Sequence, residues 1–282
     1  MAFELRPARL EDVPGIVEWT TDTFDWGDYV PERISTWISD PNSQVLVAVG
    51  EADTPLAVAH VVMLSPTEGW LEAARVHPDH RRSGLGSALN HAGVDWARSL
   101  GARVVRLATE ADNAAARSQV EALGYRQTSS WVYSWIEVRP HHWTSRDLRL
   151  RPAPRSDVDA AWMFWSTSEL ALGGRSFIAD GWQWRKALPG DLTKAASNGE
   201  FFQNPAGWAI ADQPEEDVTR TRWLATTKEE APRLLDGLIA LAADRESAGL
   251  TVKVPNIPWA SETVIRAGGE PKEILVYSKA LL

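Results

Sequence analysis

Two glycines separated by one residue, Gly84 and Gly86, mark the point where a strand-like pattern gives way to a helix-like one. A residue without a Cβ atom lets the neighbouring backbone N–H groups turn toward a single anion. The helix that begins here adds unsatisfied N–H donors and the positive end of its dipole. Arg81 and Arg82 stand directly before the glycines and add positive charge. The segment therefore predicts a cradle for a phosphate or pyrophosphate group.

The pattern differs from two other kinds of site. The dinucleotide-binding fingerprint needs a third glycine where this sequence has Leu89, so that fingerprint is absent. His77 and His80 have a spacing that suits a metal pair, but they lie in a loop with only Asp79 as a carboxylate beside them. We therefore expect no metal site here.

The elements that position this cradle follow from hydrophobic period and turn residues. We expect a strand at residues 69–76 leading into the cradle and a helix at 84–100 leading out of it. Further strands are expected at 3–7, 45–49, 56–64, 103–108 and 128–136, and further helices at 10–19, 31–37 and 113–123. Antiparallel strands come first and β-α-β units follow, which predicts an α/β fold with a mixed sheet.

The chain repeats itself once. The sequence Leu-Arg-Pro-Ala at 5–8 recurs at 150–153, and Asp-Val at 12–13 recurs at 157–158 with the same offset. Later segments echo one another in the same order, namely 70–71 with 223–224, 99–101 with 247–249 and 131–134 with 275–278. We predict two homologous domains, 1–138 and 148–282, joined by a polar linker at 139–147.

The cradle resembles the signature of the GNAT superfamily of acyl-CoA transferases. That signature is Gln/Arg-x-x-Gly-x-Gly/Ala after a strand ending in Val-x-Pro, and the residues from Val76 to Gly86 fit every position. The family pattern continues with an Asn after the next strand and a helix closing in Leu-Gly-aromatic, here Asn113 and the residues 123–125. The resemblance spans about residues 3–136. It implies two tandem GNAT-like domains, each with a mixed central sheet flanked by helices.

The resemblance also implies the co-substrate, acetyl-CoA, and how it is held. Backbone and side chains of the cradle would bind the pyrophosphate, and the end of the preceding strand together with Asn113 would bind the pantetheine arm. The amine would attack the thioester directly, and the N–H of Val76 would stabilise the developing oxyanion. The cofactor-binding residues expected on this basis are Arg75, Val76, Arg81, Arg82, Ser83, Gly84, Leu85, Gly86, Ser87 and Asn113.

The residues that would handle protons are less sharply defined. An amine must be neutral to attack, so a general base is expected. Glu72, on the strand that would carry the thioester, is the first candidate; Glu110 and Asp112 at the end of the next strand follow. Glu72 can equally be an exposed strand residue. Many relatives carry a Tyr as general acid where this sequence has Val120, so Ser118 or water would have to replace it.

The acceptor is expected beside residues 20–29, which join the first two helices. Asp22, Asp25, Trp26 and Asp28 could bind a cation next to an apolar body by charge and by cation–π contact. The alternative is a solvated loop whose aromatic residues pack into the core. The substrate predicted from this segment is a small, cationic amine.

The second repeat lacks the cradle. Residues 226–233 contain no glycine, and Glu229 and Glu230 stand where a pyrophosphate would need N–H donors. We expect this half to bind no CoA and to cover the acceptor side, extend the sheet or form a homodimer contact. Residues 173–175 and 182–185 could reach the acceptor, although a structural role is as plausible.

Composition sets the outer limits. The net charge of −9 argues against sequence-independent nucleic-acid binding. The absence of cysteine excludes thiolate chemistry, and no apolar run reaches the ~20 residues that cross a membrane. We expect a cytoplasmic enzyme without a membrane or nucleic-acid partner. A peptide N-acetyltransferase and a non-catalytic acyl-CoA-binding scaffold are the alternatives to the small-amine enzyme.

Overall fold

The computed structural model describes residues 3–21, 23, 27–140, 144–215 and 217–281. The chain divides into two compact units. Unit 1 consists of residues 1–107, 115–126 and 277–282, and unit 2 consists of residues 108–114 and 127–276. None of the helices in the described part of the chain combines the length and apolar composition that a membrane-spanning helix needs.

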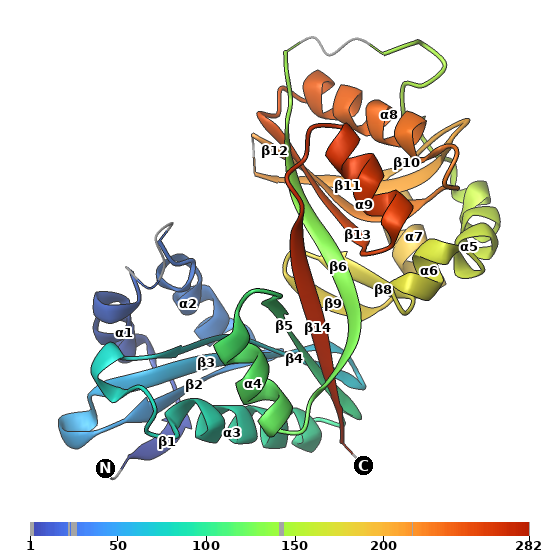
Figure 1. The fold of residues 1–282 in the computed structure, drawn as a ribbon. Helices are drawn as coiled ribbons and strands as arrows, with labels where there is room; N and C mark the ends of the chain where they lie inside the picture. Colours follow the sequence, from blue (N-terminus) through green and yellow to red (C-terminus); the bar gives the residue numbers. More distant parts are fainter. Residues whose placement is uncertain (1–2, 22, 24–26, 141–143, 216, 282) are drawn as a thin grey trace. The chain divides into compact units, whose positions relative to one another are not determined.

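The first repeat follows the expected order of elements (Figure 1). Its strands are β1 (Glu4–Pro7), β2 (Ser43–Val49), β3 (Pro55–Ser65), β4 (Glu68–Val76), β5 (Val104–Glu110) and β6 (Arg126–Glu137). Its helices are α1 (Val13–Thr20), α2 (Val30–Ser39), α3 (Leu85–Ser99) and α4 (Ala114–Ala122). Every strand and helix predicted for this half is present, with ends that shift by a few residues.

The sheet of unit 1 separates two helical layers. β1, β2, β3 and β4 are antiparallel neighbours, and β5 joins β4 in parallel. α1 and α2 cover one face, where Ile16 and Ile34 are fully buried against the valines of β2. α3 covers the other face so closely that a Cβ on Gly93 would lie 3.3 Å from the side chain of Leu71. Each face therefore has its own core.

The second repeat has the same order of elements with one insertion. Its strands are β7 (Arg151–Pro152), β10 (Phe201–Asn204), β11 (Gly207–Glu215), β12 (Val218–Ala225), β13 (Gly249–Pro255) and β14 (Lys272–Ala280). Its helices are α5 (Val158–Ser166), α6 (Glu169–Gly173), α7 (Pro189–Asn198), α8 (Ala231–Asp244) and α9 (Pro258–Arg266). The insertion lies between α5 and β10 and consists of one additional helix and the hairpin of β8 (Phe177–Asp180) and β9 (Gln183–Lys186).

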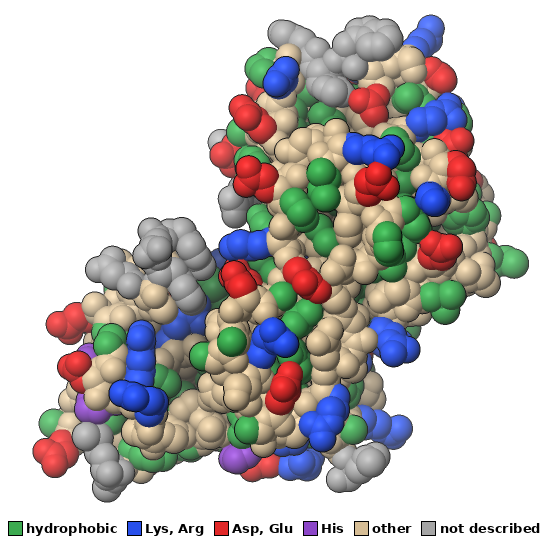
Figure 2. Space-filling model, in the orientation of Figure 1, with side chains coloured by type: hydrophobic (Ala, Val, Ile, Leu, Met, Phe, Trp, Pro, Cys, Tyr) green, Lys and Arg blue, Asp and Glu red, His purple; other side chains and the backbone are tan. Residues whose placement is uncertain are grey.

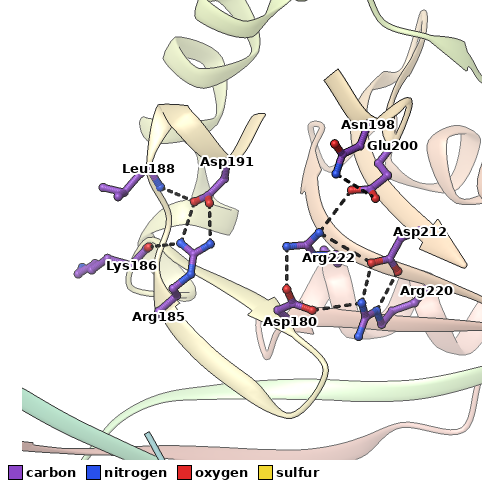
Figure 3. A network of polar contacts seen from close by, with 10 residues as sticks. All are labelled: Asp180, Arg185, Lys186, Leu188, Asp191, Asn198, Glu200, Asp212, Arg220 and Arg222. Atoms are coloured by element: carbon purple, nitrogen blue, oxygen red, sulfur yellow. Dashed lines mark hydrogen bonds and ion pairs between the residues drawn. The ribbon is translucent and has the colours of Figure 1, made fainter. Parts of the chain in front are cut away.

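Ion pairs fasten the inserted hairpin to unit 2 (Figure 3). Asp180 at the end of β8 contacts Arg220 at 3.1 Å and Arg222 at 2.7 Å, both on β12. Asp212 of β11 accepts two hydrogen bonds from Arg220. On β9, Arg185 binds Asp191 at the start of α7. Asp180 is 44% exposed, whereas the other side chains of these pairs are largely enclosed, and each lies beside a charge of opposite sign.

The compact units do not coincide with the two repeats. β6, the last strand of the first repeat, pairs with β13 in unit 2, from Trp131 opposite Pro255 to Glu137 opposite Gly249. Conversely, the last six residues of the chain belong to unit 1, where the Leu281 N–H donates to the Arg103 carbonyl at 2.8 Å. The domain limits expected from the repeat, 1–138 and 148–282, stay a prediction about homology, since unit 2 contains β6 from residue 127 onward and unit 1 contains residues 277–282.

Candidate functional site

The predicted cradle lies between β4 and α3. Arg82 and Gly84 both have left-handed backbone conformations, with φ of +62° and +87°. The first helical hydrogen bond runs from Ala88 to the carbonyl of Gly84. Within the described residues, no hydrogen bond uses the backbone N–H groups of residues 82–87. These N–H groups are therefore available to an anion, which is the arrangement predicted from the sequence.

The surroundings of the cradle are open and positively charged. The side chains of Arg81 and Arg82 are exposed, and neither forms an ion pair with a residue that the structure describes. Ser83 donates its hydroxyl to the carbonyl of His80, which closes the turn before the helix. At Gly84 an added Cβ would meet nothing within 4 Å, so the backbone conformation alone calls for glycine there.

The second glycine is closely approached by α4. A Cβ on Gly86 would lie 2.8 Å from Nε2 of Gln119 on α4 and 3.8 Å from Val76 at the end of β4. The first turn of α3 therefore lies next to the end of β4 and to α4. A larger side chain at position 86 would have to displace the end of the Gln119 side chain.

β4 itself changes direction near its end. Its parallel register with β5 joins Glu68 through Trp70 with Val104 through Arg106, and β4 then continues to Val76. A bulge interrupts the antiparallel pairing with β3 between Val58 and His60, and Ala73 adopts a φ of +55° there. Such bulges bend a strand and re-aim the side chains beside it. Glu72 directly precedes this bend.

Glu72 lies in a polar and aromatic cluster, on the face of the sheet that α1 and α2 cover. Its carboxylate contacts His60 Nδ1 at 3.0 Å through one oxygen and accepts a hydrogen bond from Trp70 Nε1 at 3.0 Å through the other. The side chain is 13% exposed, so it is enclosed but reached by solvent. Trp37 of α2 stacks on the imidazole of His60 with ring centroids 4.4 Å apart.

Arg75 and Asp28 form an ion pair at the edge of this cluster. Arg75 Nε lies 2.6 Å from Asp28 Oδ2, and the Asp28 side chain is fully buried. Arg75 also lies over the ring of Tyr29 at 5.5 Å. Burial, with the nearby charge of Glu72 as a further cause, raises the pKa of Tyr29 to about 12. The negative charge of Asp28, predicted to recognise a cationic acceptor, is thus compensated by Arg75, which was predicted to bind the cofactor.

Other predicted residues lie elsewhere. Glu110 and Asn113 belong to unit 2, where Lys272 Nζ lies 3.0 Å from the Glu110 carboxylate. Val120 is buried on α4 and contributes no acid. Asp22, Asp25 and Trp26 lie outside the described residues. Among the described residues, no group of three or more His, Asp or Glu side chains could hold a metal ion.

The corresponding place in unit 2 differs in each respect. Only residues 226–230 separate β12 from α8, compared with 77–84 between β4 and α3. Pro232 occupies the first turn of α8, and Glu230 at its start pairs with Arg233 at 2.7 Å. A small hollow beside α8 and α9 is lined by mostly apolar side chains of β12, β13 and both helices.

Sequence reasoning missed His60 and Trp37 as parts of the site, whereas Tyr29 lies in the segment 20–29 that was predicted beside the acceptor. His60 stands on the strand paired with the one that carries Glu72. The available signal was the β3–β4 hairpin, whose two strands bring residues near 60 and 72 together. Trp37 carried no comparable signal.

The comparisons agree with this architecture. The model of the acetyltransferase (GNAT) family matches residues 13–125. No curated protein sequence matches the chain. A GCN5-related N-acetyltransferase from Sphaerobacter thermophilus has a similar structure, with a TM-score of 0.70 at 16% identity over 99% of this chain and 95% of that chain.

Two further structures are similar over nearly the whole chain. One is a tandem GNAT protein from the clavulanic acid biosynthesis pathway, with a TM-score of 0.62 at 13% identity, covering 99% of this chain and 98% of that one. The other is a glucosamine N-acetyltransferase region of a fungal multi-domain GH3 beta-N-acetylglucosaminidase, with a TM-score of 0.67 at 13% identity over 99% of this chain and 38% of that chain. At such low sequence identity, structural similarity shows only the fold. Because the similarity extends over nearly the whole chain, it confirms the predicted tandem two-domain form.

Proposed function

The chain belongs to the acetyltransferase (GNAT) family through residues 13–125, and from this premise we propose that it transfers the acetyl group of acetyl-CoA to an amine. The observation that carries the proposal is the set of free N–H groups at residues 82–87, beside two exposed arginines. A pyrophosphate needs this combination of donors and positive charge. The thioester of acetyl-CoA supplies an activated acetyl group, and the protein supplies binding, orientation and proton transfer.

The fit of acetyl-CoA rests on two glycines with different roles. Gly84 allows the left-handed turn that directs the N–H groups, and Gly86 has no Cβ atom, which would lie only 2.8 Å from Nε2 of Gln119. The pyrophosphate would lie against residues 82–87, and the pantetheine arm would follow β4 toward Val76. The proposed contacts of Arg75 and Asn113 with the cofactor stay predictions.

Glu72 is the general base of the proposed reaction. It lies before the bend in β4, it is enclosed yet reached by solvent, and both of its oxygens are held by hydrogen bonds. A base so placed could accept the proton of the attacking amine. Glu110 is the weaker candidate, because it already pairs with Lys272 in unit 2.

The acceptor is proposed to be a small amine. The enclosed, aromatic surroundings of Glu72 favour a compact molecule over a peptide chain. The glucosamine N-acetyltransferase region among the similar structures makes amino sugars a reasonable first class to test. A cationic acceptor would need Asp22 or Asp25, since Arg75 already compensates Asp28.

Unit 2 is proposed to bind no CoA. The start of α8 has a proline in place of one N–H donor and a glutamate where the phosphate would lie. Like charges would repel there.

The surface charge bears on the predicted partners. Basic and acidic side chains are interspersed over the face shown in Figure 2. The predicted absence of a nucleic-acid partner, the homodimer contact and the cytoplasmic location stay predictions.

Calorimetric titration of acetyl-CoA tests the proposal, with the wild type compared with the variant Gly84→Glu/Gly86→Glu. We expect one site per chain in the wild type and none in the variant. Gly190→Glu is the matched control, because Gly190 is exposed on α7 with nothing within 4 Å of an added Cβ, and it should bind like the wild type. Release of free CoA thiol with a panel of polyamines, amino sugars and peptides then identifies the acceptor class.

The outcomes separate the alternatives. Two sites per chain would show that unit 2 also binds CoA. Binding without thiol release for any amine would favour the non-catalytic scaffold. Turnover restricted to peptides would replace the small-amine acceptor by a protein one, and absence of binding would overturn the transferase assignment.

A further inference from the structure

His60 and Glu72 are partners across two antiparallel strands. The register of β3 and β4 pairs them directly, and His60 Nδ1 lies 3.0 Å from Glu72 Oε1. An ionised carboxylate only accepts hydrogen bonds, so the histidine is the donor in this pair. The second carboxylate oxygen accepts from Trp70 Nε1 at 3.0 Å. Glu72 is therefore fixed by one N–H donor at each oxygen.

The imidazole of His60 is enclosed on its other sides. The residue is only 3% exposed, and the Trp37 ring stacks on it at 4.4 Å with an angle of 10° between the planes. Its Nε2 atom is buried and has no hydrogen-bond partner among the described residues. A proton that entered the ring from Glu72 would have no polar group on the far side to receive it. The geometry is that of a support for Glu72 and not of a proton relay to solvent.

Three further charged or titratable side chains, Tyr29, Arg75 and Asp28, lie near the pair. Tyr29, whose pKa burial raises to about 12, stays a neutral phenol near Glu72 at ordinary pH. Arg75 and Asp28 compensate one another in their own ion pair. The N–H donors of His60 and Trp70 hold the carboxylate of Glu72, one at each oxygen.

We propose that His60 is a positioning residue for Glu72: its Nδ1–H holds the carboxylate in the orientation that accepts the proton of the acceptor amine. This inference rests on the proposed function, since it concerns the base of that reaction. In the step concerned, the amine nitrogen bonds to the thioester carbonyl carbon, the carbon–sulfur bond breaks with its electrons on sulfur, and the amine proton moves to Glu72. His60 contributes direction and gives up no proton.

A set of variants separates positioning from simple packing. His60→Phe keeps a ring against Trp37 but removes the donor, whereas His60→Asn keeps an N–H near the position of Nδ1. With acetyl-CoA and the best amine of the panel, we expect His60→Phe to lower kcat about 10-fold to 100-fold, as part of the general-base contribution. The KM for acetyl-CoA should stay within about 2-fold, and His60→Asn should restore most of kcat.

The double variant with Glu72→Gln provides the decisive comparison. If His60 acts through Glu72, His60→Phe has no further effect on kcat once Glu72 is replaced. Equal fold-losses in both backgrounds would overturn the proposal, as would an unchanged kcat in a His60→Phe variant that binds acetyl-CoA normally by calorimetry.

A readout independent of turnover tests the same contact. In protein with nitrogen-15-labelled histidine, NMR reports which ring nitrogen carries hydrogen, and the His60 signal is the one missing in His60→Asn. We expect hydrogen on Nδ1, with a shift of this signal in Glu72→Gln. Hydrogen on Nε2 alone would overturn the proposal. If no amine is turned over but Nδ1 carries hydrogen, the proposed function fails while the contact itself stands.

Discussion

Arg75 donates two hydrogen bonds to Asp28, from Nε to Oδ2 at 2.6 Å and from Nη2 to Oδ1 at 3.1 Å. The Asp28 carboxylate is fully buried. Removing one partner of a buried ion pair leaves an uncompensated charge and typically costs about 3–5 kcal/mol. We expect Arg75→Met to lower the free energy of unfolding by an amount in this range, measured by urea denaturation.

An exposed ion pair serves as the control for this prediction. Arg149 and Asp244 lie 2.8 Å apart, and both side chains are about half exposed. Solvent screens such pairs, so Arg149→Met should cost less than about 1 kcal/mol. Equal effects at the two sites would show that the Arg75–Asp28 pair contributes no more than a surface contact.

The backbone of the cradle gives a second prediction. Gly84 has a φ of +87° and Gly190 does not have a positive φ, while neither has a neighbour within 4 Å of an added Cβ. A left-handed conformation costs a non-glycine residue roughly 1–2 kcal/mol. We expect Gly84→Ala to be destabilised by about that amount and to bind acetyl-CoA more weakly. Gly190→Ala should be neutral or slightly stabilised, because alanine favours the helix.

One outcome for Gly84→Ala and Gly190→Ala would contradict this prediction. If Gly84→Ala and Gly190→Ala unfold at the same denaturant concentration and bind acetyl-CoA equally, the left-handed turn is not what shapes the cradle.

The sequence was sufficient to predict the strands and helices of the first repeat and the position of the cradle. It was insufficient to predict the cluster around Glu72. Alternating hydrophobic residues and glycine stops locate each strand and helix of the first repeat to within a few residues. The contact of His60 with Glu72 depends on strand register. The irregularity between Met63 and Ser65 moves the pairing by one residue, so a regular hairpin would have placed Ala73 opposite His60. A shift of one residue reverses which side chains share a face.

The sequence pattern also could not show how the final strands of the two repeats divide between the units. The repeated Val-Tyr-Ser segments at 132–134 and 276–278 identify two equivalent strands, but hydrophobic pattern does not say which unit each one joins. The division of these strands between the units depends on contacts between residues far apart in the sequence.

The equivalent tyrosines of these strands give a third prediction. Tyr277 is fully buried in unit 1 and donates its hydroxyl to the Glu121 carboxylate at 2.9 Å. A hydrogen bond to a charged group contributes about 1.5–3 kcal/mol. We expect Tyr277→Phe to lose stability in this range. Tyr133→Phe is the matched control, because the Tyr133 hydroxyl makes no hydrogen bond with a described residue, and this variant should lose less than about 0.5 kcal/mol.

Truncation extends this prediction to the whole strand end. Deleting residues 277–282 removes the part of β14 that unit 1 contains. We expect the shortened chain to lose acetyl-CoA binding in calorimetry, although the deletion lies far from the cradle in sequence. Normal binding by the shortened chain would show that unit 1 does not need the end of β14 to bind acetyl-CoA.

The last prediction concerns Lys253 on β13. Its Nζ lies 5.2 Å from the ring centre of Tyr133 and 5.5 Å from that of Trp182, and it makes no hydrogen bond or ion pair with a described residue. Burial, and then the charge of Arg220, lower the pKa of Lys253 from 10.5 to about 8. The unfolded chain therefore binds more protons than the folded one between about pH 8 and pH 10.5, and wild-type stability should rise with pH across this window.

Lys253→Met removes the buried ammonium group, and with it the free-energy cost of taking that charge out of water. We expect the variant to be more stable than the wild type below pH 8, by on the order of 3 kcal/mol, with the difference shrinking as the pH rises toward 10. Urea denaturation of both proteins at intervals from pH 7 to pH 10 measures the difference, since the other groups titrate alike in both. Lys194→Met, at an exposed lysine of α7, should show no such trend. A difference for Lys253→Met that does not change with pH would mean that the buried ammonium loses nothing on leaving water.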